Sequence, residues 1–421
     1  MTEFGSYPPA YYDTAIRQGR ILVSNERVLP DHVLSASDVL THTVHRHEPA
    51  VADTLRIVEE TDSLWVVDKP GTLPVHPCGG YHHQSLTSML KPSFGIHRLD
   101  RLTSGLVLLA KDSPTAQLWT QALRERNATK VYIARVRGRF PSQASAPWLK
   151  SIPAYSDSLD RKEIPHGCWV ANGKGELVDG CSFMDLAQGG IVISEGSCDE
   201  VLREDSDIEW LHLTCPTRIE KAKDGVCRCG TFGELTDDEY KRTVKSAETS
   251  FAVVRYDEAS DSTVVICRPL TGRTHQIRLH LQYLNHPIAN DPNYGGVLWY
   301  GNAEGRDTAT EVQKKLTEMN EHGNSNALVT TDVPATEAEV AKISESSRRE
   351  NESMDEFIRR TCVWCSRGHG CEDRGLWEFL TRSAGIWLHA WMYRVTLGDK
   401  EYSYKTTLPS WVNADVKTGS R

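Results

Sequence analysis

The hydrophobic positions of this chain fall mainly into short runs that polar turns separate. Runs of this length, rich in Val, Ile, Leu and aromatic residues, are typical of buried β-strands. We predict strands at residues 64–67, 105–111, 131–136, 251–255, 263–267, 387–396 and 401–408. The polar segment 257–261 lies between two of these runs and predicts a hairpin.

Helical spacing of apolar residues is confined to a few short stretches. Residues 113–126 open with Ser-Pro, which predicts an N-cap followed by proline at the first helical position. The predicted inner face comprises Leu118, Ala122 and Leu123. Residues 273–284 also have helical spacing, and residues 11–18 predict a short helix. Strands with segregated helices predict an α+β fold, with a central mixed or antiparallel sheet flanked by helices and loops.

The distribution of apolar and polar segments also divides the chain. Residues 1–56 predict a small N-terminal accessory unit, and residues 57–412 predict the main domain. Two polar segments, at about 141–245 and 301–360, have little sustained apolar periodicity, so we interpret them as insertions. We expect the second to be a surface excursion or disordered. Residues 413–421 form a tail.

The net charge of −9 argues against a nucleic-acid partner until its distribution is considered. Residues 141–250 hold 20 acidic and 12 basic side chains, and residues 301–360 hold 13 and 8. The remainder of the chain therefore carries a net charge of +4. Because phosphate binding responds to local charge, this remainder is compatible with RNA.

The cysteines and the first residues bear on the compartment. The chain has eleven cysteines and no basic segment followed by an apolar one near its start, which predicts reduced thiols in the cytoplasm or nucleus. A mitochondrial location stays open. No apolar run approaches the ~20 residues of a membrane span, so we expect no membrane partner. We expect the chain to act as a monomer.

Ionisable and small polar residues are densest at 97–105, which reads His-Arg-Leu-Asp-Arg-Leu-Thr-Ser-Gly. Asp100 lies between Arg98 and Arg101 and precedes a predicted buried strand. A loop carboxylate with arginine neighbours is usually a salt-bridged group, so this segment alone does not establish a catalytic acid. A second dense segment, 269–280, is basic and reads Pro-Leu-Thr-Gly-Arg-Thr-His-Gln-Ile-Arg-Leu-His. On a helix, its Thr, Ile and Arg at 274, 277 and 278 would share one face.

Together these two segments resemble the RluA family of pseudouridine synthases. The family motif His-Arg-Leu-Asp-x-x-Thr-Ser-Gly is found at 97–105, and Gly-Arg-Thr-His-Gln-Ile-Arg-x-His is found at 272–280. Between them, Lys-x-Tyr-x-Ala-x-Val-x-Gly is found at 130–138. Further matches, in the family's order, lie at 67–77, 286–295 and 388–409. Six matches in order are far more specific than one motif.

The N-terminal part is similar to the eukaryotic subgroup of the family that acts on tRNA. The similarity rests on His-Arg-His-Glu-Pro-Ala-Val at 45–51 together with Pro-Val-His-Pro at 74–77. The unit ahead of it occupies the place of an S4-like RNA-binding domain in several relatives. The resemblance therefore implies an S4-like accessory unit.

The resemblance also implies the pseudouridine synthase fold and the isomerisation of uridine to pseudouridine in RNA without a cofactor. Asp100 matches the catalytic carboxylate, which either attacks the ribose or removes a ribose proton. Arg278 matches the cation that keeps this carboxylate ionised. Tyr132 matches an active-site tyrosine that can stack on the base and serve the late removal of the proton from C5. Without the other matches, Tyr132 would be interpreted as a core aromatic.

The other site residues are implied to bind the substrate. Ile277 would pack on the uracil. Arg98 matches the position that enters the space left by a flipped base, and an ordinary phosphate contact is an equal alternative. The candidates for phosphate contacts are Lys69, Arg273 and His275.

The identity of the RNA follows only from the subgroup, which points to tRNA and leaves rRNA and mRNA open. Two other hypotheses remain. The chain could be a catalytically inactive RNA-binding or chaperone protein on the same fold. It could also be a hydrolase that uses Asp100 to release the base.

One cysteine cluster has the spacing of a metal site. Cys362, Cys365, His369 and Cys371 can supply four zinc ligands. Tetrahedral sites usually join two chain segments, however, and the chemistry of the family requires no metal. We therefore predict reduced thiols here, with no metal and no other cofactor.

Overall fold

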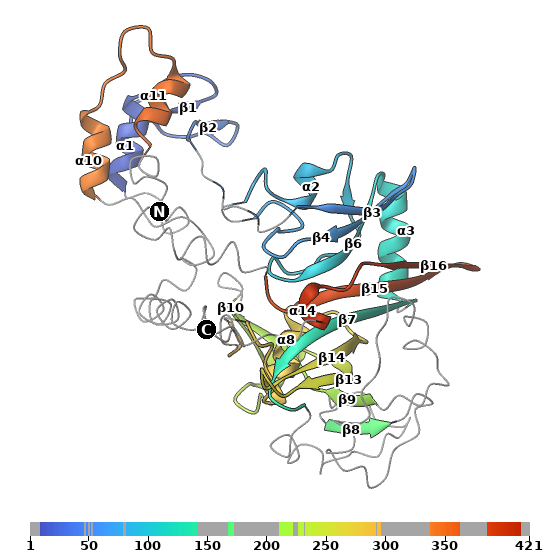
Figure 1. Cartoon of the computed structure of the whole chain (residues 1–421). Coiled ribbons are helices and arrows are strands. Elements are labelled where there is room, and N and C mark those ends of the chain that lie inside the picture. The colour runs from blue at the N-terminus through green and yellow to red at the C-terminus, as the bar shows by residue number, and fades with distance from the viewer. Residues whose placement is uncertain are drawn as a thin grey trace. The chain divides into compact units, whose positions relative to one another are not determined.

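The computed structural model describes most residues of the six motif segments and part of the rest. The described residues are 9–45, 48, 51, 54–78, 81–125, 127–140, 167–171, 210–221, 226–230, 232–291, 293–295, 337–362 and 385–413. The chain forms two compact units (Figure 1). The first comprises residues 1–50, 78–83 and 319–382, and the second comprises residues 51–77, 84–318 and 383–421.

A large mixed sheet forms the centre of the second unit (Figure 1). Its order is β3-β4-β6-β15-β7-β14-β13-β9-β8, with β5 paired to β6 and β16 paired to β15. The bounds are β3 Arg56–Glu60, β4 Leu64–Lys69, β5 Phe94–Gly95, β6 Ser104–Ala110, β7 Ala128–Arg137, β8 Gly167–Ala171, β9 Trp210–Thr214, β13 Glu248–Asp257, β14 Ser262–Pro269, β15 Leu388–Leu397 and β16 Lys400–Lys405. The β6–β15 pair is parallel and the other pairs are antiparallel. The predicted mixed sheet and α+β class are confirmed.

The second unit also contains a smaller sheet and several helices. A three-stranded sheet has the order β11-β10-β12. Its strands are β10 Thr217–Lys221, β11 Val226–Cys229 and β12 Val244–Lys245. The helices are α2 Leu86–Met89, α3 Ser113–Arg124, α7 Asp237–Thr243, α8 Gln276–Tyr283 and α14 Ser410–Asn413. No helix in the described ranges is long and apolar enough to cross a membrane.

The predicted strands are found because their apolar runs are buried in this sheet. In β6, every residue from Gly105 to Ala110 is buried, and β4 and β7 contribute further buried valines. The predicted hairpin is β13–β14, which turns at Asp261 in the left-handed conformation, with φ +45°. Central strands of one sheet therefore account for most of the continuous apolar runs in the sequence.

The inner face of α3 differs from the prediction. Leu118 is 56% exposed, whereas Trp119 and Ala122 are buried. The ring of Trp119 lies 5.2 Å from that of Tyr402 on β16, so the buried side of the helix is centred on the tryptophan. The N-cap is Asp112 rather than Ser113, and its carboxylate accepts a hydrogen bond from the backbone of Thr115.

The first unit joins the start of the chain to a much later segment. Its described elements are α1 Pro9–Arg17, β1 Ile21–Val23, β2 Leu40–His42, α10 Glu337–Glu345 and α11 Met354–Arg360. The predicted helix near the N-terminus is present as α1. The buried cluster of this unit comprises Tyr11, Ala15, Ile21, Val340 and Ile343.

The prediction for 301–360 is wrong where this segment is described. Residues 337–345 and 354–360 are helical, and each helix buries a pair of apolar residues. Two buried residues per short helix are too few to produce a recognisable period. The remaining residues of this segment, 301–336, lie outside the described part, as do most of 141–209. An S4-like relationship of the first unit stays a prediction.

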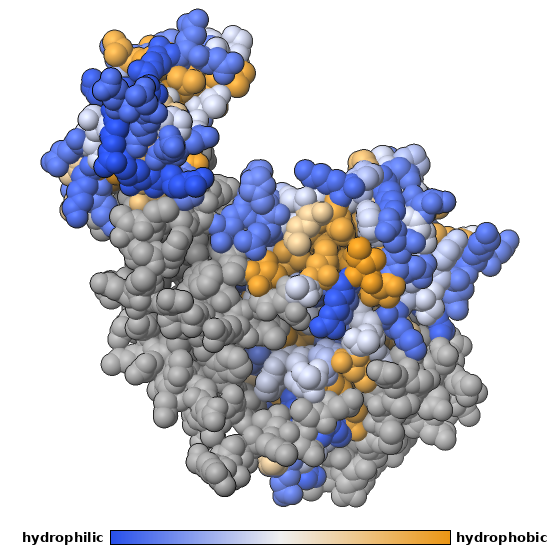
Figure 2. All heavy atoms as spheres, turned by 45° about the horizontal axis from the view of Figure 1, so that its top comes forward, coloured by the Kyte–Doolittle hydropathy of each residue, from blue (hydrophilic) through white to orange (hydrophobic). Residues whose placement is uncertain are grey.

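Both units leave large apolar side chains at the surface, and Figure 2 shows hydrophobic areas beside hydrophilic ones on the face that it presents. The exposed set includes Leu29, Val33, Leu34, Val39 and Leu40 in the first unit. In the second unit, Leu270 is 50% exposed. Single exposed apolar residues are normal, but Leu270 belongs to the basic segment 269–280 described above.

One glycine is required where β6 meets β15. Gly105 has φ +110°, and a Cβ atom added there would lie 2.3 Å from the backbone oxygen of Ala390. The parallel strands approach so closely at this point that only glycine fits.

We expect Gly105→Ala to lower the free energy of unfolding by roughly 3 kcal/mol or more, because both the backbone conformation and the strand contact oppose a methyl group. Denaturant unfolding measures the change. Gly233→Ala is the matched control, since nothing lies within 4 Å of its added Cβ. Equal stability of the two variants would contradict the close approach of the strands.

Candidate active site

A cavity of about 730 Å³ opens in the second unit. It is lined by the loop that precedes β6, by β7, and by the segment from the end of β14 into α8. Seven of the eight predicted site residues line it, namely Arg98, Asp100, Tyr132, Arg273, His275, Ile277 and Arg278. Lys69 is the exception. Residues about 180 positions apart therefore meet in one cavity.

The loop that carries Asp100 is anchored on both sides. The backbone N–H of Thr103 donates to the carbonyl of Asp100 at 3.1 Å, and the side chain of Thr103 is buried. Ahead of the loop, Nε2 of His97 accepts a hydrogen bond from the backbone of Leu108 on β6. Burial lowers the pKa of His97 to about 3, so its ring is neutral and can accept this bond. Asp100 itself keeps 22% of its side chain exposed, towards the cavity.

Lys69 corrects one prediction. Its side chain is fully buried, and its Nζ donates to the carbonyls of Pro70, Leu73 and Arg101. The ammonium group therefore cannot reach an RNA phosphate. It ties the end of β4 to the loop that carries Asp100, which is a structural task. Burial lowers the pKa of Lys69 to about 7.

Arg278 forms the central ion pair of the cavity. Its Nη1 donates to Oδ2 of Asp100 at 3.3 Å. On its other edge, Nε and Nη2 donate to the two oxygens of Asp291 at 2.6 and 2.9 Å. Both Arg278 and Asp291 are buried. Burial disfavours the charge of Arg278, but the carboxylates of Asp291 and Asp100 outweigh it and raise the pKa of Arg278.

His275 approaches the same carboxylate from another side. Its Nε2 lies 3.7 Å from Oδ2 of Asp100, and its Nδ1 lies 2.6 Å from the hydroxyl of Tyr294. Burial lowers the pKa of His275, so the ring is neutral near pH 7. Its backbone has the left-handed conformation, with φ +56°, directly before α8. Such strain in a non-glycine residue is typical of functional sites.

Tyr132 and Tyr393 form a buried hydroxyl pair beside the carboxylate. Their oxygens are 2.8 Å apart, and both rings line the cavity. Burial raises the pKa of Tyr132 to about 12, so its hydroxyl is protonated at neutral pH. The hydroxyl of Tyr132 is therefore held by a second phenol.

Two of the exposed arginines that line the cavity, Arg98 and Arg273, differ in how they are held. Nε of Arg273 donates to the carbonyl of Ser246 at 2.9 Å, which fixes the side chain along the rim. Arg98 is exposed, and its guanidinium makes no hydrogen bond or ion pair among the residues that the structure describes. Ile277 is buried and presents an apolar surface to the cavity. These three side chains offer two cations and one apolar contact to a ligand.

Sequence reasoning missed several residues that organise the site. Gln276 bonds to Thr271 and to the backbone of Arg273, which fixes the turn before α8. Asp291 and Tyr294 hold Arg278 and His275 as described above. Asp291 and Tyr294 lie in a segment that matches the family motifs, but no periodicity predicts which side chain they contact.

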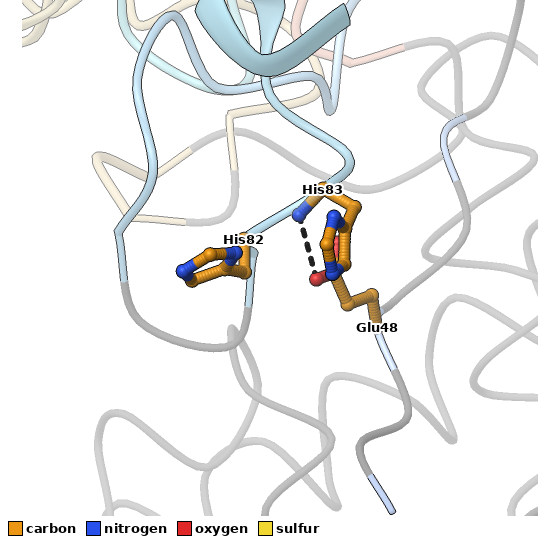
Figure 3. A group of neighbouring side chains, drawn as sticks. All are labelled: Glu48, His82 and His83. Atoms are coloured by element: carbon orange, nitrogen blue, oxygen red, sulfur yellow. Dashed lines mark hydrogen bonds between the residues drawn. The ribbon is translucent and has the colours of Figure 1, made fainter.

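One group among the described residues has the donor types of a metal site. The ligand atoms of Glu48, His82 and His83 lie within 4.8 Å of one another (Figure 3). The backbone N–H of His83 donates to a carboxylate oxygen of Glu48 at 2.7 Å. One carboxylate and two imidazoles suit a divalent transition metal. The group belongs to the first unit, whereas the cavity residues belong to the second.

The structure describes only part of the predicted cysteine cluster. Cys362 is buried, and its thiol lies 4.0 Å from the carbonyl of His45. Cys365, His369 and Cys371 lie outside the described residues. In the second unit, the thiol of Cys229 donates to the carbonyl of Leu279. The prediction of reduced thiols without zinc stays a prediction for this cluster.

Comparison with known proteins finds similarity to pseudouridine synthases. Residues 63–169 and 193–283 match the family described as RNA pseudouridylate synthase. A human protein named pseudouridylate synthase RPUSD2 is 35% identical over 72% of this chain, which spans 43% of that protein. The tRNA pseudouridine(31) synthase of Saccharomyces cerevisiae is 28% identical over 99% of this chain and 89% of its own length.

A further yeast relative is the mitochondrial tRNA pseudouridine(32) synthase. It is 29% identical over 98% of this chain and 71% of its own length. The chain therefore spans less than half of the human relative but most of the two yeast proteins.

We expect Lys69→Met to lower the free energy of unfolding by about 2–4 kcal/mol, because three buried carbonyls lose their donor. Lys111→Met is the matched control. Lys111 pairs with Glu60, a half-exposed carboxylate, so its loss should cost about 1 kcal/mol or less. Denaturant unfolding of both variants at pH 7 makes the comparison, and similar costs would contradict the structural task of Lys69.

The same lysine predicts a pH dependence. Its pKa falls from 10.5 in the unfolded chain to about 7 in the folded one, so the unfolded chain binds more protons between these values. The contribution of Lys69 to stability should therefore increase as the pH rises from 7 to 10, and Lys69→Met should lack this slope. Unfolding free energies of the wild type and Lys69→Met across that range test the sign.

Proposed function

Because the chain belongs to the RNA pseudouridylate synthase family, we propose that it isomerises uridine to pseudouridine in RNA, with Asp100 as the catalytic carboxylate. The observation that carries the proposal is the pairing of Asp100 with Arg278 at 3.3 Å on the wall of one cavity. A pure binding protein has no physical need for a half-buried acid held next to a buried arginine.

The carboxylate performs the first step. The N1–C1′ bond breaks, and an oxygen of Asp100 either bonds to C1′ or takes a proton from the ribose. Both routes need an ionised carboxylate that is partly removed from water. Arg278 meets this need, because its charge stabilises the anion while leaving a face of Asp100 open to the cavity.

The second step turns the released uracil and joins C5 to C1′. Carbon C5 then loses its proton and N1 gains one, so the product is an isomer of the substrate. The ring of Tyr132 supports the base during this turn, and Ile277 packs on its other side. Since the hydroxyl of Tyr132 is protonated and bonded to Tyr393, it can remove the C5 proton only by passing its own proton on.

The target uridine must leave its stack to reach Asp100. Extrusion costs a few kcal/mol, which contacts in the cavity must offset. Arg98, Arg124 and Arg273 are exposed cations among the described residues that line this cavity, and we place the backbone of the target nucleotide, or the space that it vacates, beside Arg98 and Arg273. His275 is a further candidate for a phosphate contact.

We further propose that the substrate is a tRNA. Both yeast relatives that match nearly the whole chain are named as tRNA pseudouridine synthases. The chain would work as a monomer in the cytoplasm or nucleus, and one relative is named as mitochondrial, which keeps that compartment open. The first unit would contribute to binding of the tRNA in the way of an S4-like domain.

We expect Asp100→Ala to abolish turnover, because Asp100 is the only carboxylate among the described residues that line the cavity. Release of tritium from C5-labelled uridine in tRNA measures the reaction, and Asp100→Asn serves as the isosteric control. Equal release by wild type and Asp100→Ala would favour an RNA-binding protein without catalysis. Free uracil among the products would indicate a hydrolase instead.

Arg278→Met should fold but be nearly inactive, since it leaves two carboxylates facing each other without a cation. Removing one partner of a buried pair costs roughly 3–5 kcal/mol of stability, so melting must be measured beside activity. Turnover near that of the wild type in a folded variant would reject the role of the arginine.

A further inference from the structure

The neighbours of Asp100 approach one of its two oxygens. Arg278 donates to Oδ2 at 3.3 Å, and Nε2 of His275 lies 3.7 Å from the same atom. Among the residues that the structure describes, no side chain is bonded to Oδ1. A carboxylate that is held by one edge keeps the lone pairs of its other oxygen for a reaction.

Asp291 holds one edge of the Arg278 guanidinium. An arginine facing a single carboxylate prefers two parallel N–H bonds, one to each oxygen. Here that bidentate pairing is made with Asp291, at 2.6 and 2.9 Å, and Arg278 donates to Asp100 through Nη1. Asp291 is fully buried, and Oδ1 of Asp291 also accepts the backbone N–H of Asn293, which fixes its orientation.

Tyr294 supports both partners of Asp100. Its ring lies beneath the guanidinium of Arg278, with Cζ 4.8 Å from the ring centroid. Its hydroxyl lies 2.6 Å from Nδ1 of His275. This contact fixes the imidazole so that Nε2 is directed at Asp100, and the left-handed backbone of His275 brings the ring to that place.

We propose that Asp291 and His275 are positioning residues that hold Asp100 by Oδ2 and so reserve Oδ1 as the atom that reacts with the ribose. This inference rests on the proposed function. Without Asp291, nothing would hold the Nε–Nη2 edge of Arg278, and the guanidinium would be free to turn and engage both oxygens of Asp100. Without His275, the carboxylate would lose its second contact at Oδ2 and could rotate about the Cβ–Cγ bond.

The test measures single-turnover rates at saturating RNA, by tritium release from C5-labelled uridine in tRNA. We expect Asp291→Asn to be about 100-fold slower and His275→Gln about 10-fold slower than wild type, since small displacements of a reacting group have effects of this size. The Kd for the same tRNA should change by less than about threefold in Asp291→Asn, because Asp291 is buried and does not line the cavity.

A matched control separates positioning from stability. Asp257 forms a comparable buried ion pair with Arg135 in the same unit, outside the cavity lining. Asp257→Asn should lower the melting temperature much as Asp291→Asn does, yet keep its single-turnover rate within about threefold of wild type. Tyr294→Phe keeps the ring beneath Arg278 and removes only the bond to His275. Combined with His275→Gln, it should add no further loss, because the two residues act through one contact.

The outcomes are distinguishable. Wild-type rates in folded Asp291→Asn and in His275→Gln, with Asp100→Ala inactive, would overturn this inference and leave the proposed function intact. Equal losses in Asp291→Asn and Asp257→Asn would also overturn it, by attributing the effect to stability. If Asp291→Asn does not fold, His275→Gln decides alone, since its side chain is partly exposed. A wild type that releases no tritium would overturn the proposed function and this inference together.

Discussion

The charge shared between Asp100, Arg278 and Asp291 is the constraint on which the rest of the second unit depends. One buried guanidinium serves two carboxylates, so the cluster carries a net negative charge inside the protein. Such an arrangement is tolerable only where hydrogen bonds hold every partner. The short bonds to Asp291 supply that stability, and the longer one to Asp100 leaves the outer acid exposed to the cavity.

The sheet brings these groups together from distant parts of the chain. The parallel contact of β6 with β15 places the loop of Asp100 next to β7, which carries Tyr132. Strand β14, the other neighbour of β7, leads directly into the turn before α8. Buried Lys69 then ties the turn after β4 to the loop of Asp100, because it donates to the carbonyls of Pro70 and Leu73 and to that of Arg101. The site is therefore a product of strand order, and loops alone could not fix it.

The sequence predicted the strands and the principal chemical groups well, for a physical reason. Buried central strands produce continuous apolar runs, and the motif around Asp100 is dense enough to be recognised. The sequence could not predict that Lys69 faces inward, because a lysine after a strand is usually solvated. Nor could it pair Asp291 with Arg278, since such contacts depend on the register of distant segments. The helices within 337–360 escaped notice because each buries only two apolar residues.

The first unit has a consequence for biosynthesis. Helix α1 buries Tyr11 and Ala15 against Val340 and Ile343 of α10, and the hydroxyls of Thr14 and Ser344 are 2.7 Å apart. The ribosome delivers α1 about 330 residues before its partner helix. At a synthesis rate of roughly 5–20 residues per second, α10 is made on the order of 15 to 70 s after α1. During this interval α10 does not yet bury the apolar side of α1. The nascent chain must be shielded from aggregation through this interval, because the unit can close only after residues 337–345 have been synthesised.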